Sequence, residues 1–284
     1  MSSLAAEFGA SVRAEVLKLR KRPSTWIICL IAFLYVALLD YLLTYVVVKT
    51  APRRAGLSRG TLHTLINNLY PINFVRYSLT DVVVIGAALA LILGALAMSS
   101  EYDWRTLRNA FSQGPGRLTV LASKVAVLIP LTGILSLLFL GAAALSSLVV
   151  GSLDGHLGSW PALSQVVGGF FATWLILSVW LLLGLFLGVL LRQTAMAIAA
   201  GLVYAIVVEG LILSLFASNG VIEAIKKIFP GANAKALTLA FGQLPSSSAT
   251  PLVGAGQAVA VLFGYVLVFI GISALLLRRR DVVG

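Results

Sequence analysis

Long runs of hydrophobic residues alternate with shorter polar segments along almost the whole chain. The hydrocarbon core of a bilayer is about 30 Å thick, and a helix of roughly 20 apolar residues crosses it. The pattern predicts an all-α integral membrane protein with six transmembrane helices, at about 26–48, 82–98, 124–150, 165–191, 195–217 and 254–277. Because the number of spans is even, we expect both termini on the same side, and we treat residues 1–284 as a single transmembrane domain.

Two further segments have the spacing of amphipathic helices. In residues 4–22, apolar side chains recur on one helical stripe, which predicts an N-terminal interfacial helix; the alternative is a disordered basic tail. Residues 221–241 predict two short outer helices between the last two spans, separated by a Pro-Gly break. We expect these two helices to fold back onto the outer leaflet.

The most polar segment lies between the second and third predicted spans, at residues 99–124. Ser100 suits an N-cap position, and Trp104, Arg108 and Phe111 follow at helical spacing, so the pattern predicts a helix over 101–112. A plain connection between two helices needs only about 2–8 residues. We therefore interpret this helix as a surface for a protein partner, with a helix resting on lipid headgroups as the alternative.

Composition and charge support the membrane assignment. The chain is 60% hydrophobic and only 11% charged, with a mean hydropathy of +1.01, whereas soluble domains carry about 25% charged residues. The net charge of +11 comes from residues in connections and tails, which argues against nucleic acid as a partner. With cytoplasmic termini, thirteen of the 21 Lys and Arg residues lie inside. This bias predicts a multi-pass protein of the cell membrane with both termini cytoplasmic.

Motifs of catalysis and cofactor binding are missing from the sequence. The chain contains no phosphate-binding loop of the form GxxxxGK[ST], no HExxH, no paired CxxC and no GxSxG. Its only two histidines, His63 and His156, are far apart in predicted outer loops, so we expect no metal site. We predict that the chain is not an enzyme and holds no cofactor of its own.

Two acidic residues fall inside predicted spans. Asp40 and Glu209 each lie fourteen residues into their span, counted from Trp26 and Ala195, and so at similar depth. An ionisable group within a membrane usually faces the interior of the helix bundle or a water-filled cavity. Both could line a pathway for substrate or protons, or both could be structural hydrogen-bonding groups. The sequence leaves these two interpretations open.

Five segments follow one another over nearly the whole length of the chain: AEVLKLRKRPSTW, NFVRYSLT, EYDWRTLRNAFSQGPGRLTVLASK, LLLGLFLGVLLRQTAMAIAAGLVYAIVVEGLI and FPGANAKAL. In these segments and their order, the chain resembles the permease subunits of ABC-2 type exporters. The resemblance implies that residues 4–22 are the connecting (elbow) helix, 101–112 the coupling helix and 221–241 the outer re-entrant helices. Glu209 matches an acidic position that is common in the fifth span of the family, whereas Asp40 has no assigned counterpart.

The resemblance also implies a function. The chain would form the translocation pathway of an ATP-driven exporter and dimerise with a second copy or a paralogue. It would bind two copies of a separate ATPase, which hold the ATP and magnesium, and would export a small molecule, a peptide, a lipid or a polysaccharide. The coupling surface would consist of Glu101, Tyr102, Asp103, Trp104, Arg105 and Arg108. The alternative is a stand-alone, proton-coupled secondary transporter that uses Asp40 and Glu209; the internal repeats that would favour it are not evident.

Overall fold

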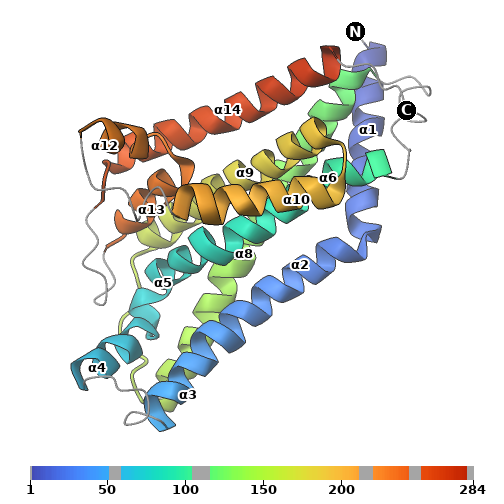
Figure 1. Cartoon of the computed structure of the whole chain (residues 1–284). Coiled ribbons are helices and arrows are strands. Elements are labelled where there is room, and N and C mark those ends of the chain that lie inside the picture. The colour runs from blue at the N-terminus through green and yellow to red at the C-terminus, as the bar shows by residue number, and fades with distance from the viewer. Residues whose placement is uncertain (1, 51–58, 104–115, 211–219, 243–250, 280–284) are drawn as a thin grey trace.

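The computed structural model of the chain is a bundle of helices (Figure 1). It describes residues 2–50, 59–103, 116–210, 220–242 and 251–279, and every regular element among them is a helix. Five helical stretches are long and apolar enough to cross a membrane: Pro23–Thr50, Pro71–Tyr102, Arg117–Leu153, Leu163–Leu191 and Ala255–Arg279. The predicted span at 195–217 is represented by a shorter apolar helix, Thr194–Glu209, because residues 211–217 lie outside the described ranges. The count of six spans therefore stays a prediction.

The N-terminal helix α1 (Ser2–Lys21) is separated from the first span by a proline. Arg22 has extended backbone geometry, because the residue before a proline is pushed out of the helical region, and Pro23 then starts α2 (Pro23–Leu34). The span continues as the π-helical η1 (Tyr35–Leu42) and α3 (Leu43–Thr50). As a result, α1 lies across one end of the bundle, at a steep angle to α2 (Figure 1).

The second span is longer than the predicted range of 82–98 at both ends. After α4 (Arg59–Asn68) it begins with η2 (Pro71–Asn73) and α5 (Phe74–Asp81), since the helix buries Phe74, Val75 and Leu79 despite its polar residues. It continues as η3 (Val82–Gly86) and α6 (Ala87–Asp103). The predicted helix start at Glu101, with Ser100 as its cap, is wrong. Nothing breaks α6 there, and the Ser100 hydroxyl donates instead to the carbonyl of Leu96, 2.6 Å away within the same helix.

The remaining spans are α8 (Arg117–Leu153), α9 (Leu163–Leu191) and α14 (Ala255–Arg279), with α10 (Thr194–Val203) and η4 (Tyr204–Glu209) between the last two. Two short helices, α12 (Gly220–Lys226) and α13 (Pro230–Leu239), occupy the region of the predicted outer helices. They lie at the end of the bundle away from α1, and the end of α14 lies near α1 (Figure 1). Arg117 at the start of α8 donates to the carbonyl of Leu277, 3.4 Å away, which joins α8 to that end of α14.

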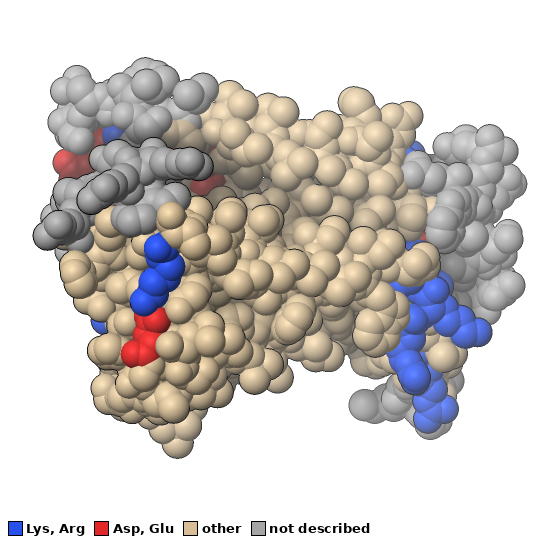
Figure 2. Space-filling view, turned by 90° about the horizontal axis from the view of Figure 1, so that it is seen from below, with Lys and Arg blue, Asp and Glu red and all other residues tan. Residues whose placement is uncertain are grey.

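The surface between the two ends is apolar. Figure 2 shows a broad face without charges, with Lys and Arg gathered mainly at one end. Large hydrophobic side chains of the first span and of α14 are exposed as well, including Leu30, Leu39, Phe263 and Leu267. Because burying such a surface in lipid is favourable and exposing it to water is not, this distribution fits a multi-pass membrane protein.

The core is organised around the contact of α6 with α9, where glycines let the two backbones touch. A Cβ atom on Gly94 would overlap the carbonyl oxygen of Leu181, and a Cβ on Gly184 would overlap that of Leu91. Small residues at such positions are the usual means by which membrane helices pack closely, since lipid provides no hydrophobic force between them. The α6–α9 pair is therefore the fixed centre to which the other helices attach.

We expect Gly94→Ala or Gly184→Ala to destabilise the protein, because even one methyl group must push α6 and α9 apart. Overpacking of this kind costs about 1–3 kcal/mol. The check is the thermal unfolding midpoint of the detergent-solubilised protein. Gly264→Ala in α14, where a Cβ meets nothing within 4 Å, is the matched control. Equal midpoints for all three variants would contradict the close contact.

Candidate functional site

Four charged side chains from three helices meet at the end of the bundle that carries α1. The Lys124 ammonium lies 2.6 Å from Glu101 Oε1 and 2.9 Å from Glu15 Oε2. The Lys18 ammonium nitrogen (Nζ) lies 2.8 Å from the same Glu101 oxygen and 2.7 Å from Glu15 Oε1. We call this group, Glu15, Lys18, Glu101 and Lys124, the charge joint, because it ties α1 to α6 and α8.

The charge joint compensates its own charges in the interior. Lys124 is only 1% exposed, and its ammonium also donates to the carbonyl of Ala97 at 3.2 Å, so it has three acceptors. Although partial burial by itself lowers the pKa of Lys18, its hydrogen bonds and charge interactions with Glu101 and Glu15 outweigh this effect, and the pKa is raised. A buried charge is tolerated when it is paired and hydrogen-bonded, as Lys124 is here, whereas Lys18 is only half-buried.

The position of the charge joint bears on the predicted coupling helix. Glu101 lies shortly before residues 104–115, and Lys124 lies in α8 shortly after them, so the joint fixes the helices on both sides of that segment. Trp104, Arg105 and Arg108 themselves lie outside the described residues. Glu101 is buried within the joint and not on an outer surface, whereas Tyr102 is half-buried, with the Arg192 guanidinium 5.8 Å from its ring centre. Asp103 is the last residue of α6.

Asp40 has a partner that the sequence analysis missed. Its carboxyl group is hydrogen-bonded to that of Asp81 and accepts a hydrogen bond from the Tyr77 hydroxyl. Asp81 is almost fully buried, and two carboxyl groups can share a hydrogen bond only when one of them holds a proton. Asp81 directly precedes the predicted second span at 82–98, although the helical spacing of Val75, Ser78 and Leu79 would extend that span far enough to include it.

The intramembrane acids coincide with irregular helix. Asp40 lies in η1, Asp81 directly precedes η3, and Glu209 ends η4, and all three segments are π-helical. Single π-helical turns inside α-helices are rare and are often found at functional sites. This coincidence makes these acids candidates for a role beyond packing.

The Glu209 carboxyl group is hydrogen-bonded to the start of helix α13. This buried carboxyl group accepts hydrogen bonds from the backbone N–H of Gly231 and from the Tyr204 hydroxyl. Gly231 is the second residue of α13, so the carboxylate lies at the positive end of that helix. A Cβ on Gly231 would overlap Glu209 Oε2, which explains why glycine is needed there. The partners of Glu209 thus differ from those of Asp40, and the structure does not bring these two predicted residues into one site.

A second charged group holds the opposite end of the bundle. Asp154, directly after α8, is bound by Lys49 at 2.8 Å and by the hydroxyls of Tyr45 and Tyr70 at 3.0 and 3.2 Å. Although burial by itself raises the pKa of Asp154, these hydrogen bonds and the Lys49 charge lower it overall. Among the described residues, no three His, Cys, Asp or Glu side chains are grouped so as to hold a metal ion.

The family model described as "ABC-2 family transporter protein" matches residues 11–208. The match includes α1 from Ser11 onward, four of the five long helices and all but the last residue of η4. No curated protein matches the chain.

The first prediction from this site concerns Lys124. Replacing it by Met leaves Glu15 and Glu101 buried beside one cation instead of two, and breaking a buried ion pair in this way costs about 3–5 kcal/mol. We expect a large fall in the thermal unfolding midpoint, and partial recovery in Lys124→Met/Glu101→Gln, which removes one of the uncompensated charges. Lys227→Met at the exposed Lys227–Glu223 pair is the control and should leave the midpoint unchanged. A parental midpoint for Lys124→Met would contradict the charge joint.

The second prediction concerns Glu209 and Gly231. Glu209→Ala and Gly231→Ala each disrupt the same contact, so we expect both to lower the unfolding midpoint and the double variant to lose less than the sum. Gly210→Ala, where a Cβ meets nothing within 4 Å, is the control. Glu209→Gln keeps an acceptor for the Gly231 N–H and should remain folded. Full transport by Glu209→Gln assigns the residue to the scaffold, whereas lost transport in a stable variant assigns it to the pathway.

Proposed function

The chain belongs to the ABC-2 family of transporter proteins, and from this premise we propose that it is the permease subunit that forms the translocation pathway of an ATP-driven exporter. The observation that carries the proposal is the family match over residues 11–208, on a chain with five helices long enough to cross a membrane. The chain is thus a component of membrane transport. Its place as the pathway-forming subunit is the finer step that we propose.

The energy would come from a separate ATPase. The sequence has no phosphate-binding loop, so ATP and magnesium would be held by two copies of a partner chain. These copies would dock at residues 101–112 of this chain and of a second permease, either an identical copy or a paralogue. Both termini would be cytoplasmic, on the same side as the docking segment.

The charge joint supports a route for coupling. A force applied to residues 104–115 reaches α6 through Asp103 and α8 through Gly116, and the joint links both helices to α1. Because paired buried charges are costly to separate, the three helices would move together and not slide past one another. α6 would then transmit the motion to α9 through the glycine contact between them. On this proposal, Glu101 is a positioning residue behind the docking surface and not a contact residue on it.

One observation favours a second candidate, the stand-alone proton-coupled transporter. The Asp40–Asp81 pair is a place where one proton can be held within the membrane-spanning region. A proton relay through Asp40 and Glu209 would require the two side chains in one pathway, but they have different partners. It predicts substrate movement driven by a proton gradient in vesicles that contain this chain alone, which the permease proposal does not.

The test is reconstitution with the ATPase of the same exporter. We expect no ATP hydrolysis by this chain alone and a stable complex after co-expression. Trp104→Ala or Arg105→Ala should leave membrane insertion intact but weaken docking, because loss of an aromatic or arginine anchor costs about 2 kcal/mol, roughly thirtyfold in affinity. Lys227→Ala, on the segment predicted to be outside, is the control. Normal co-purification and transport by both anchor variants, or ATP hydrolysis by the isolated chain, would overturn the proposal.

A further inference from the structure

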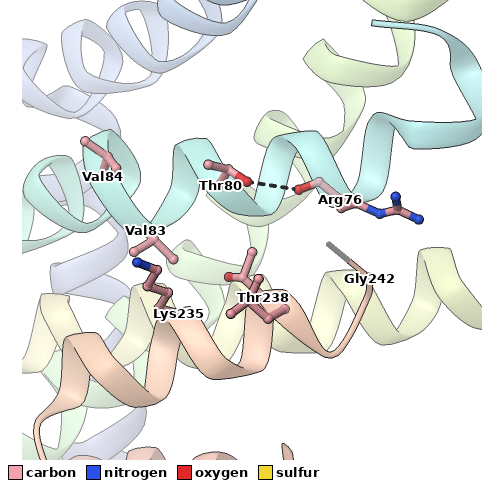
Figure 3. Close-up of a pocket in the computed structure, with 8 residues that line it drawn as sticks. Arg76, Thr80, Val83, Val84, Lys235, Thr238 and Gly242 are labelled. Carbon is pink, nitrogen blue, oxygen red and sulfur yellow. Dashed lines mark hydrogen bonds between the residues drawn. The ribbon is translucent and has the colours of Figure 1, made fainter. Parts of the chain in front are cut away.

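A cavity of about 320 Å³ lies between the outer part of the second span and helix α13. Its walls come from α5 and η3 on one side and from α13 and the turn that follows it on the other (Figure 3). This is the end of the bundle away from α1 and the charge joint (Figure 1).

The described residues that line the cavity combine an apolar wall with two cations. Val83, Val84 and Leu239 supply apolar surface, Arg76 and Lys235 supply positive charge, and no acidic side chain is among these lining residues. Lys235 extends from α13 toward Val83, whereas Arg76 lies at the other side of the cavity, next to Gly242 (Figure 3). Two separated cations beside an apolar wall suit a ligand with an anionic group and an apolar body.

Arg76 is held in place before any ligand binds. Its Nε donates to the carbonyl of Phe241 at 3.3 Å. Gly242 has a φ of +108°, which favours glycine, and a Cβ there would come within 2.8 Å of the guanidinium. The turn after α13 is thus shaped around the Arg76 side chain. The positive charge of Arg76 is therefore fixed in position at that side of the cavity.

The polar residues in the wall add little recognition of their own. The Thr80 hydroxyl donates to the carbonyl of Arg76 at 3.3 Å, and the Thr238 hydroxyl donates to that of Ala234 at 3.0 Å. Because both hydroxyl protons are used within their own helices, neither threonine offers a neutral donor for a sugar or a polar peptide. The charge of the ligand and its apolar contacts would decide what binds.

The cavity is open to the apolar surface of the molecule. Val84 is 62% exposed, and Thr80 and Lys235 are also exposed. Val84 belongs to a segment long and apolar enough to cross the membrane, so a molecule with an apolar tail can reach this wall from within the bilayer. A ligand that is anionic but has no tail would leave the valine side unfilled.

We propose that this cavity binds an anionic amphiphile, with a phosphate or carboxylate head at Lys235 and an apolar chain along Val83 and Val84, while Arg76 adds positive charge from the other side of the cavity. The molecule could come from two sources, an exported substrate or a resident membrane lipid, which share this chemistry. If it is exported, the inference rests on the permease function and narrows its substrate class. The binding itself does not depend on the ATPase.

The first arm of the test measures binding of dodecyl phosphate and of the neutral dodecyl glycerol to the purified full chain in a neutral detergent. We expect the phosphate to bind at least about tenfold more tightly, in line with the loss of charge-assisted hydrogen bonds in the neutral compound. Lys235→Gln should lose most of this preference, and Lys235→Glu should abolish it. Lys235 is exposed, so these variants should fold. Arg76→Gln is the second variant, accompanied by its unfolding midpoint, because Arg76 also packs on the turn.

The control for this arm is Lys227→Gln. This variant removes one positive charge, as Lys235→Gln does, but Lys227 lies in the turn between α12 and α13 and does not line the cavity. It should bind dodecyl phosphate as the parent does. Equal binding of the phosphate and the neutral compound, or undiminished binding by Lys235→Glu, would overturn the inference.

The second arm separates the two sources in the complex with the ATPase, reconstituted in phosphatidylcholine vesicles. Stimulation of ATP hydrolysis by dodecyl phosphate, lost in Lys235→Glu, identifies an exported substrate. A resident lipid is identified if dodecyl phosphate does not stimulate ATP hydrolysis, whereas added phosphatidylglycerol changes hydrolysis by the parent but not by Lys235→Glu. Both results support the cavity. If the complex fails to form while the first arm succeeds, the permease proposal fails and the binding site stands.

Discussion

The arrangement of one end of this protein depends on the ion pairs that the buried Lys124 ammonium forms with Glu15 and Glu101. A charge in the interior is tolerated only with close partners, and Lys124 finds Glu15 from α1, Glu101 from α6 and the carbonyl of Ala97. The need to satisfy that one group brings three helices together. It also fixes the helices on both sides of residues 104–115, which include most of the segment on which we propose that the ATPase docks. The most costly group in this region is therefore placed where the proposed function needs rigidity.

The acids in the membrane-spanning region have three different roles. Glu101 neutralises lysines, Asp40 and Asp81 share a hydrogen bond, and Glu209 holds the beginning of α13. The last two arrangements occur at π-helical turns, where the regular backbone ladder is already altered. In lipid a carboxyl group without partners costs several kcal/mol, so each acid is explained only when its partners are found. Position along the sequence does not reveal these partners.

The glycine contact and the cavity divide the second span into two parts with different properties. Around Gly94 the span is locked against α9, with no room for a methyl group. Around Val83 and Val84 it faces open space beside α13, with two cations nearby. One helix thus has a tightly packed part toward the proposed coupling segment and an open part beside the proposed binding site. This relation links the proposed coupling segment to the proposed binding site.

The sequence by itself determined the class of protein and the approximate positions of its helices. Apolar runs of span length can be satisfied only as membrane helices, because every backbone group in lipid must be bonded within the helix or its neighbours. It also singled out Asp40, Glu209 and the segment at 101–112 as unusual. Only the tertiary structure decided that Glu101 faces inward, that Asp81 belongs with Asp40, and that Arg76 shares a cavity with Lys235. These pairs join residues on different helices, and hydrophobic periodicity within one helix carries no information about which face of another helix it will meet.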